Sequence, residues 1–189
     1  MVFGPDRLID PAKLAHVFVS PRQRAQQTWK IFADTNIDDQ STARPPISIT
    51  EDLAEWDYGL YEGKLIAEIR ALRQERELDQ ERAWDIWRDG CEEGETPEQV
   101  TARLDHLIQK IKDIQRPNMH GENDSDIVLV AHGHILRAFV KRWLGYGLGF
   151  PLSMMLEPGG VGGLSYQHHN IAEPACLVGM SFPHTNSCK

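Results

Sequence analysis

Two stretches of the chain combine a short apolar run with a helical pattern that follows it. The run His16 to Ser20 is β-branched and aromatic and stops at Pro21, which predicts a buried strand ending in a turn. From Arg22 to Ala33 apolar residues recur at helical spacing, so this strand is expected to lead directly into an amphipathic helix. Asp126 to Ala131 predicts a strand covered on both faces, and helical spacing resumes from Ile135 to Trp143.

The rest of the pattern adds further helices and strands. Leu65 to Leu72 predicts a helix with one apolar face and a charged outer face. Thr96 is expected to open another helix, with Pro97 at its first position and Gln99 completing a capping box. Short strands are expected at 47–50, 160–166 and 175–181, the last two as a hairpin. Strands that alternate with helices predict an α/β fold with helices packed against a mainly parallel sheet.

Length and charge narrow the possibilities further. A chain of 189 residues predicts a single domain, which we place at 1–182, with a loose tail at 183–189. The net charge of −8 disfavours binding to nucleic acids and to anionic membranes, so any bound anion needs a local basic pocket. The sequence has no apolar run long enough to span a bilayer, and its opening residues are charged, so a cytoplasmic protein is expected.

Polar residues stand where both predicted strands end, which is where ligands bind in open α/β sheets. Ser20 closes the first strand, and Arg24 falls in the first turn of the following helix, where its guanidinium and the helix dipole face an anion together. His132 closes the second strand immediately before a helix. Spacing alone leaves two alternatives open, an ordinary surface arginine and a satisfied core histidine.

A third candidate is Glu55, in the aperiodic segment DLAEWDYGLYEG. A carboxyl group packed among Trp56, Tyr58 and Tyr61 suits a general acid, whereas the alternative is a surface loop glutamate. The segment AWDIWRDGC that follows is either a packing cap or a substrate lid.

The histidines His132, His134, His168 and His169 raise the question of a metal site. On an extended backbone, the adjacent pair His168 and His169 would point to opposite faces, and no set of clustered carboxylates accompanies either pair of histidines. We therefore expect no metal and no cofactor.

The segments SPRQRAQQT, LAEWDYGLYEG, DGCEEGE and VLVAHGHILRA together resemble the histidine phosphatase superfamily, also called phosphoglycerate mutase-like. The resemblance covers nearly the whole chain, and EWDYGLYEG, ERAWDIWRDGCEEGET and GLSYQHHNIAEPA are similar to fungal sugar-bisphosphatases of the sedoheptulose 1,7-bisphosphatase type. It implies a three-layer α/β sandwich with a phosphate pocket at the carboxyl end of the sheet. It also implies phosphomonoester hydrolysis through a phosphohistidine, with a small sugar phosphate as the substrate.

The resemblance also implies a role for each candidate residue. Arg24 would bind the transferred phosphoryl group, and Glu55 would protonate the leaving oxygen. His132 would donate a hydrogen bond to the phosphoryl oxygens and stabilise the charge that develops during transfer. Ser20, Tyr58 and Gly133 would be further substrate contacts.

One family feature is missing from the sequence. Family members carry an R-H-G strand end whose histidine attacks phosphorus, and no R-H-G triplet occurs here. The only histidine before Glu55 is His16, which lies inside a predicted strand and cannot take that role. We therefore expect the first strand of the family fold to be absent, turnover to be impaired, and the exposed sheet to favour self-association. The alternative is a non-catalytic protein on the same scaffold that binds phosphate ligands or interacts with a partner.

Overall fold

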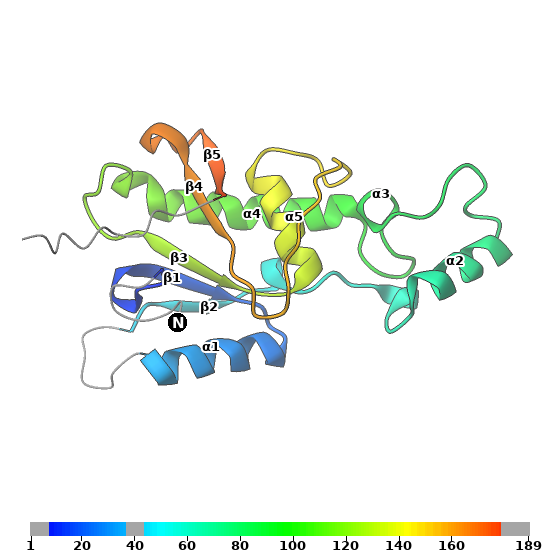
Figure 1. The fold of residues 1–189 in the computed structure, drawn as a ribbon, viewed down its shortest axis with the longest axis horizontal. Coiled ribbons are helices and arrows are strands. Elements are labelled where there is room, and N and C mark those ends of the chain that lie inside the picture. Colours follow the sequence, from blue (N-terminus) through cyan, green and yellow to red (C-terminus); the bar gives the residue numbers. More distant parts are fainter. Residues whose placement is uncertain (1–7, 37–43, 179–189) are drawn as a thin grey trace, which may run out of the picture.

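The computed structural model describes residues 8–36 and 44–178, which form one central sheet, one hairpin and the helices around them (Figure 1). The expected tail at 183–189 lies outside this range. The helices and strands follow the chain as β1 (Leu14–Val19), α1 (Gln23–Asn36), β2 (Ile47–Ile49), α2 (Ile66–Glu75), α3 (Ile86–Asp89), α4 (Pro97–Gln115), β3 (Asp126–Val130), α5 (Gly133–Trp143), β4 (Gly163–Tyr166) and β5 (Pro174–Leu177).

β1 is the middle strand of a parallel sheet in the order β2-β1-β3. Val17 is in register with Ile47 of β2 on one side and with Val128 of β3 on the other. α1 covers one face of this sheet, and α4 and α5 cover the opposite face (Figure 1). The expected α/β architecture, with helices flanking a mainly parallel sheet, is therefore confirmed.

The side chains of β1 alternate between two cores, as the two-residue period of a strand requires. Val17 and Val19 pack with Ala25 and Trp29 of α1. Phe18 points to the other face and joins a larger cluster made mainly by α4, α5 and the loops beside them. The buried members of this cluster on α4 and α5 are Val100, Leu104, Leu107, Ile108, Ile111, Ile135, Ala138, Phe139 and Trp143.

β3 pairs with β1 along one edge, and among the described residues no strand pairs with its other edge. Its apolar residues Ile127 to Val130 are only half-buried, whereas Val17 to Val19 of β1 are buried. The helices therefore cover the faces of β3, whereas the backbone groups along its outer edge have no ladder partner among the described residues.

β4 and β5 form the expected late hairpin as a separate antiparallel sheet, with Leu164 opposite Cys176. The hairpin is anchored on the helical layer: the Tyr166 hydroxyl donates to Gln115 Oε1 at 2.8 Å, and the Tyr166 ring lies 5.0 Å from the ring of Trp143. β4 is shorter than the strand predicted at 160–166. β5 ends at Leu177, and residues 179–181 of the strand predicted at 175–181 lie outside the described residues.

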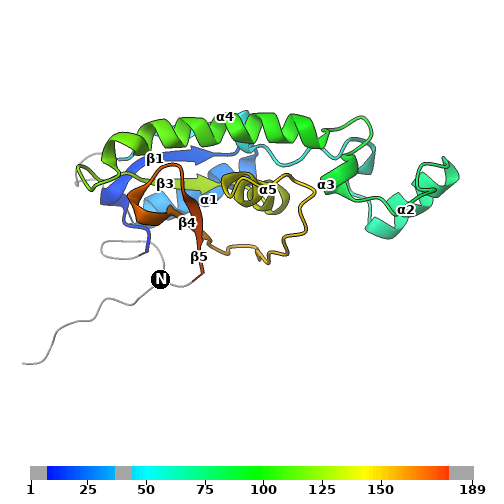
Figure 2. The ribbon, with the colours of Figure 1, turned by 90° about the horizontal axis from the view of Figure 1, so that it is seen from above.

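α4 begins as the sequence predicts. The Thr96 hydroxyl accepts from the Gln99 amide at 3.3 Å, and the Gln99 side chain accepts from the Thr96 amide at 2.8 Å. α2 departs from the prediction, because it projects away from the sheet (Figure 2) and only Ile69 is buried. Leu65 and Ile66, expected on the apolar face, are 71% and 61% exposed. The spacing of apolar residues predicts that α2 is a helix, but it does not predict how much of its apolar face other elements cover.

Two leucines test this difference between α4 and α2. Leu104→Ala should lower the free energy of unfolding by about 2–5 kcal/mol, because Leu104 is fully buried and its loss leaves a cavity. Leu65→Ala removes the same atoms from an exposed position and should change it by less than about 0.5 kcal/mol. Urea unfolding followed by tryptophan fluorescence measures both, and equal losses would contradict this account of the core.

Candidate functional site

The carboxyl ends of β1 and β3 bring Ser20 and His132 together. Ser20 follows β1 and His132 follows β3, and because these strands are parallel neighbours the two residues emerge at the same edge of the sheet. Ser20 Oγ lies 2.7 Å from His132 Nε2, and the Ser20 amide donates to the Val130 carbonyl at 2.9 Å. Both side chains are buried, so the bond between them is shielded from water.

Arg24 completes a chain of three side chains. It lies in the first turn of α1, and its Nε donates to His132 Nδ1 at 2.9 Å. Because Nδ1 accepts, the proton of the neutral imidazole is on Nε2, which donates to Ser20 Oγ. Burial lowers the pKa of His132, as do the charges of Arg24 and Arg22, while Glu55 opposes them. The ring is therefore held in one neutral tautomer.

Only the Nε atom of the Arg24 guanidinium bonds to His132. The residue is exposed, and among the described residues no hydrogen bond from its Nη atoms occurs. These two nitrogens present a donor fork of the kind that binds phosphate or carboxylate oxygens in pairs. Arg22, close enough to influence the same histidine, adds positive charge to this part of a net acidic protein.

Glu55 enters the site from the loop that follows β2. Its Oε1 accepts from the backbone amide of Trp56 and from that of Ile135, each at 3.0 Å. Ile135 is the third residue of α5, so the carboxylate sits at the helix N-terminus, close in the chain to His132. The Gly133 and His134 amides precede the first intrahelical hydrogen bond and point out of the same helix end.

Tyr58 and His134 form a second hydrogen-bonded pair beside Glu55. The Tyr58 hydroxyl lies 2.7 Å from His134 Nδ1, and the two rings meet edge to face. Burial raises the pKa of Tyr58, and the nearby Glu55 carboxylate raises it further. Spacing in the sequence does not indicate His134 as a partner of Tyr58, because 76 residues separate them.

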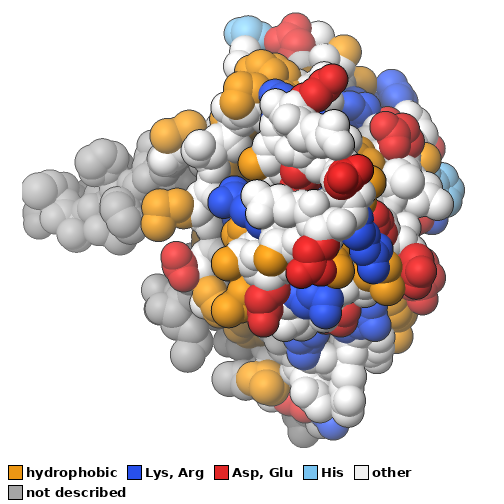
Figure 3. Space-filling model, turned by 90° about the vertical axis from the view of Figure 1, so that its right-hand side faces the viewer, with side chains coloured by type: hydrophobic (Ala, Val, Ile, Leu, Met, Phe, Trp, Pro, Cys, Tyr) orange, Lys and Arg blue, Asp and Glu red, His pale blue; other side chains and the backbone are white. Residues whose placement is uncertain are grey.

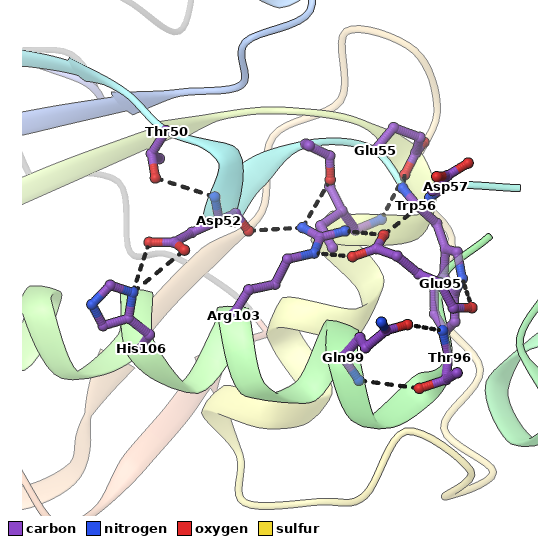
Figure 4. Close-up of polar contacts among 12 residues, drawn as sticks. Thr50, Asp52, Glu55, Trp56, Asp57, Glu95, Thr96, Gln99, Arg103 and His106 are labelled. Atoms are coloured by element: carbon purple, nitrogen blue, oxygen red, sulfur yellow. Dashed lines mark hydrogen bonds and ion pairs between the residues drawn. The ribbon is translucent and has the colours of Figure 1, made fainter.

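Arg103 of α4 fixes the Glu55 loop, as Figure 4 shows. Its Nη1 donates to the carbonyls of Asp52 and Ala54, both at 2.9 Å, and its Nε and Nη2 donate to the two carboxylate oxygens of Glu95. Glu95 Oε2 in turn accepts from the Asp57 amide at 3.0 Å. Sequence reasoning missed Arg103, since a charged residue on the flank of an amphipathic helix gives no signal of this role.

Backbone hydrogen bonds between the loop after Glu55 and the loop before α4 stabilise the same region. The Asp57 carbonyl accepts from the Glu95 amide, and the Leu60 amide donates to the Glu92 carbonyl, both at 2.9 Å. Gly59 has a φ of 49°, and a Cβ at Gly59 would collide with the Glu92 carbonyl oxygen. Glycine is needed there both for the left-handed backbone and for the close approach.

The predicted candidates therefore lie around two strand ends and the start of α5: Ser20, Arg24, Glu55, Tyr58, His132 and Gly133. The histidine pair expected to be unsuited to a metal lies elsewhere, in the turn between β4 and β5, where His168 bonds to Glu173 at 2.7 Å. Trp87, from the segment left open as a cap or a lid, packs against Trp56 and His134. Within the described residues, no helix is long and apolar enough to cross a membrane.

Comparison with known proteins identifies relatives over most of the chain. A family model described as histidine phosphatase superfamily (branch 1) matches residues 6–173. The sedoheptulose 1,7-bisphosphatase of Saccharomyces cerevisiae is 37% identical over 206 aligned residues, covering 92% of this chain and 76% of the relative. An acid phosphatase of Mycobacterium tuberculosis is 30% identical over 167 residues, covering 88% of this chain and 68% of the relative.

A solved structure also resembles this chain over most of its length. The product of the open reading frame Rv3214 from Mycobacterium tuberculosis superimposes with a TM-score of 0.61 at 27% identity, covering 87% of this chain and 70% of that one. The family match spans the β1 and β3 strand ends, the Glu55 loop and the start of α5, which together form the candidate site. On the extent of this match, the chain belongs to the histidine phosphatase superfamily, branch 1.

Proposed function

We propose that the chain binds a small phosphorylated sugar at the Arg24, His132 and Ser20 cluster, and that Glu55 supplies the proton for phosphomonoester hydrolysis. The observation that carries this proposal is the hydrogen-bonded chain from Ser20 through His132 to Arg24, which leaves the arginine fork exposed beside a carboxylate at the start of α5. Relatives named as a sugar bisphosphatase and an acid phosphatase support this class of substrate.

Each group has a distinct task in this proposal. The Arg24 Nη atoms and the amides at the start of α5 bind the equatorial phosphoryl oxygens, where negative charge collects during transfer. His132 holds the Arg24 Nε and provides its Nε2 proton to a phosphoryl oxygen that replaces Ser20 Oγ as the acceptor. Tyr58 and Gly133 border the bound substrate. Because these groups already hold one another in place, little reorganisation is needed when the anion binds.

The covalent step requires a group that the printed sequence does not contain. In that step a histidine nitrogen bonds to phosphorus, the bond from phosphorus to the leaving oxygen breaks, and Glu55 gives its proton to that oxygen. The sequence has no R-H-G triplet, and His16 lies within β1, where its Nε2 is 2.9 Å from Ser48 Oγ. We therefore propose that this form binds phosphate esters but turns them over poorly. The same observation favours the second candidate, a non-catalytic phosphate-binding protein.

The charge distribution supports a small anion as the ligand. On the face that includes α2 and α3, Lys and Arg side chains alternate with Asp and Glu (Figure 3). With a net charge of −8, a surface mixed in this way offers little attraction to a long polyanion. The Arg24 site instead suits a ligand that carries one or two phosphate groups.

Anion binding tests the Arg24 site directly. Inorganic phosphate and orthovanadate should bind the 189-residue chain, and Arg24→Ala should weaken binding at least about tenfold because the donor fork is lost. Isothermal titration calorimetry measures the affinity. Arg70→Ala, which removes an exposed arginine from α2, is the matched control and should bind as the unaltered chain does. Equal affinity in Arg24→Ala and Arg70→Ala would refute the assignment.

A turnover assay tests whether hydrolysis requires the R-H-G histidine. Phosphate release from a sugar bisphosphate should be absent or weak with the 189-residue chain and should appear in a version extended by a strand that ends in R-H-G. In the extended version, Glu55→Gln should lower kcat by about 10²- to 10⁴-fold, the usual contribution of a general acid. Rapid release by the unextended chain would contradict the impaired turnover, and an extended version with Glu55→Gln at full activity would exclude Glu55 as the acid.

A further inference from the structure

The side chain of Arg137 folds back along α5 toward the first residue of the helix. Its Nε donates to the Gly133 carbonyl at 2.9 Å. A Cβ at Gly133 would lie 3.6 Å from Arg137 Nη2, which is an ordinary van der Waals distance. The guanidinium therefore lies against the residue that follows His132, and in the proposed function this residue borders the bound substrate.

The two Nη atoms of Arg137 have no partner among the described residues. Its side chain is half-buried, and the hydrogen bond it donates there comes from Nε. The described residues that are not exposed contain one buried side-chain nitrogen or oxygen without a partner, Trp143 Nε1, so the Nη atoms of Arg137 reach solvent. Two parallel N–H donors of this kind match the oxygens of a phosphate group.

The neighbours of Arg137 include an imidazole and a second cation. Burial lowers the pKa of His134 most and the Arg137 charge lowers it further, while Glu55 opposes both. Burial also lowers the pKa of Lys141, with Asp85 opposing and Arg137 adding to the change. No carboxylate of the described residues forms an ion pair with Arg137. An anion would therefore be attracted to its charge as well as to its donors.

Arg137 and Arg24 are bound in the same way by consecutive residues. His132 Nδ1 accepts from Arg24 Nε, and the Gly133 carbonyl accepts from Arg137 Nε, both at 2.9 Å. In each arginine the Nε bond fixes the guanidinium, and within the described part of the chain the Nη atoms have no acceptor. Because Arg24 belongs to α1 and Arg137 to α5, two donor forks reach the start of α5 from different elements.

We propose that Arg137 binds a second phosphate group of the ligand and makes the site selective for a sugar bisphosphate over a sugar monophosphate. The proposal rests on the proposed function, in which Arg24 binds the first phosphate. One phosphate occupies the Arg24 fork, the sugar spans Gly133, and the other phosphate accepts hydrogen bonds from the Arg137 Nη atoms. Arg137 thus determines specificity and does not act on the reacting phosphoryl group.

The alternative arrangement is a single phosphate bound by both arginines. The two arrangements differ in which ligands depend on Arg137. If both forks bind one phosphate, loss of Arg137 weakens the binding of every phosphate ligand. If each fork binds its own phosphate, the loss weakens only ligands that carry two.

A symmetric ligand tests the proposal without turnover. 1,6-Hexanediol bisphosphate has two equal ends, and hexyl phosphate is the same carbon chain with one phosphate. At about pH 7.5 each phosphate carries close to two negative charges, and isothermal titration calorimetry should show the 189-residue chain binding the bisphosphate at least about tenfold more tightly than hexyl phosphate. In Arg137→Ala this ratio should fall to about two, the statistical factor for two equal ends, while the affinity for orthovanadate stays within about twofold.

Two further variants separate the donor fork from the charge alone. Arg137→Lys keeps the charge but loses the fork, so its preference for the bisphosphate should lie between those of the unaltered chain and Arg137→Ala. Arg70→Ala removes an exposed arginine from α2 and should leave the affinities for both ligands unchanged.

The outcomes distinguish this inference from the proposed function. A chain that binds orthovanadate but prefers the bisphosphate equally with and without Arg137, or shows no preference at all, keeps its phosphate site and loses the second one. Loss of orthovanadate binding in Arg137→Ala, with an unchanged thermal unfolding midpoint, assigns both arginines to one phosphate and overturns the inference. An unaltered chain that binds none of these ligands refutes the proposed function, and the inference is refuted with it.

Discussion

The Glu55 half of the candidate site depends on one guanidinium, that of Arg103. Arg103 lies half-buried on α4 and donates to two backbone carbonyls and to both oxygens of Glu95, so nearly all of its donor capacity is used in a single place. The two carbonyls belong to Asp52 and Ala54, which lie three residues and one residue before Glu55. Without the arginine, the two carbonyls would lose this donor, the Glu95 carboxylate would keep only the Asp57 amide, and the loop would lose its direct bonds to α4.

The bonds of Arg103 explain how the Glu55 carboxylate has a fixed position although it lies in an irregular loop. Arg103 fixes the chain before Glu55, Glu95 holds the Asp57 amide just after it, and the Ile135 amide then fixes the carboxylate itself. The second half of the site has a different support, because Ser20 and His132 are placed by the pairing of parallel strands. Loop and sheet meet at the start of α5, which contributes to both halves.

Local signals in the sequence predict much of the fold. The apolar run that becomes β1, the capping box of Thr96 and the run that becomes β3 all act over a few residues, and each is found where the pattern places it. The candidates Ser20, Arg24 and His132 could be predicted because strand ends in α/β proteins are where ligands bind.

What the sequence could not predict depends on distant contacts. The partners Ser20 and His132 are 112 residues apart, and Tyr58 and His134 are 76 apart, so no spacing rule relates them. The exposure of Leu65 follows from the projection of α2, which is a property of the whole molecule. The sequence thus predicts which residues are candidates more readily than it predicts the hydrogen bonds between them. A candidate is recognised from its neighbours along the chain, whereas its bonding partner depends on the fold.

The backbone contact at Gly59 has a consequence for how the protein can evolve. Because the chain around Gly59 touches the chain around Glu92 with no side chain between them, an insertion in either loop would have to be matched by a change in the other. Lineages that acquire a different substrate range are therefore expected to vary the two loops as a coordinated pair. A graft of one loop from a relative would bring a geometric mismatch unless its companion were transferred with it.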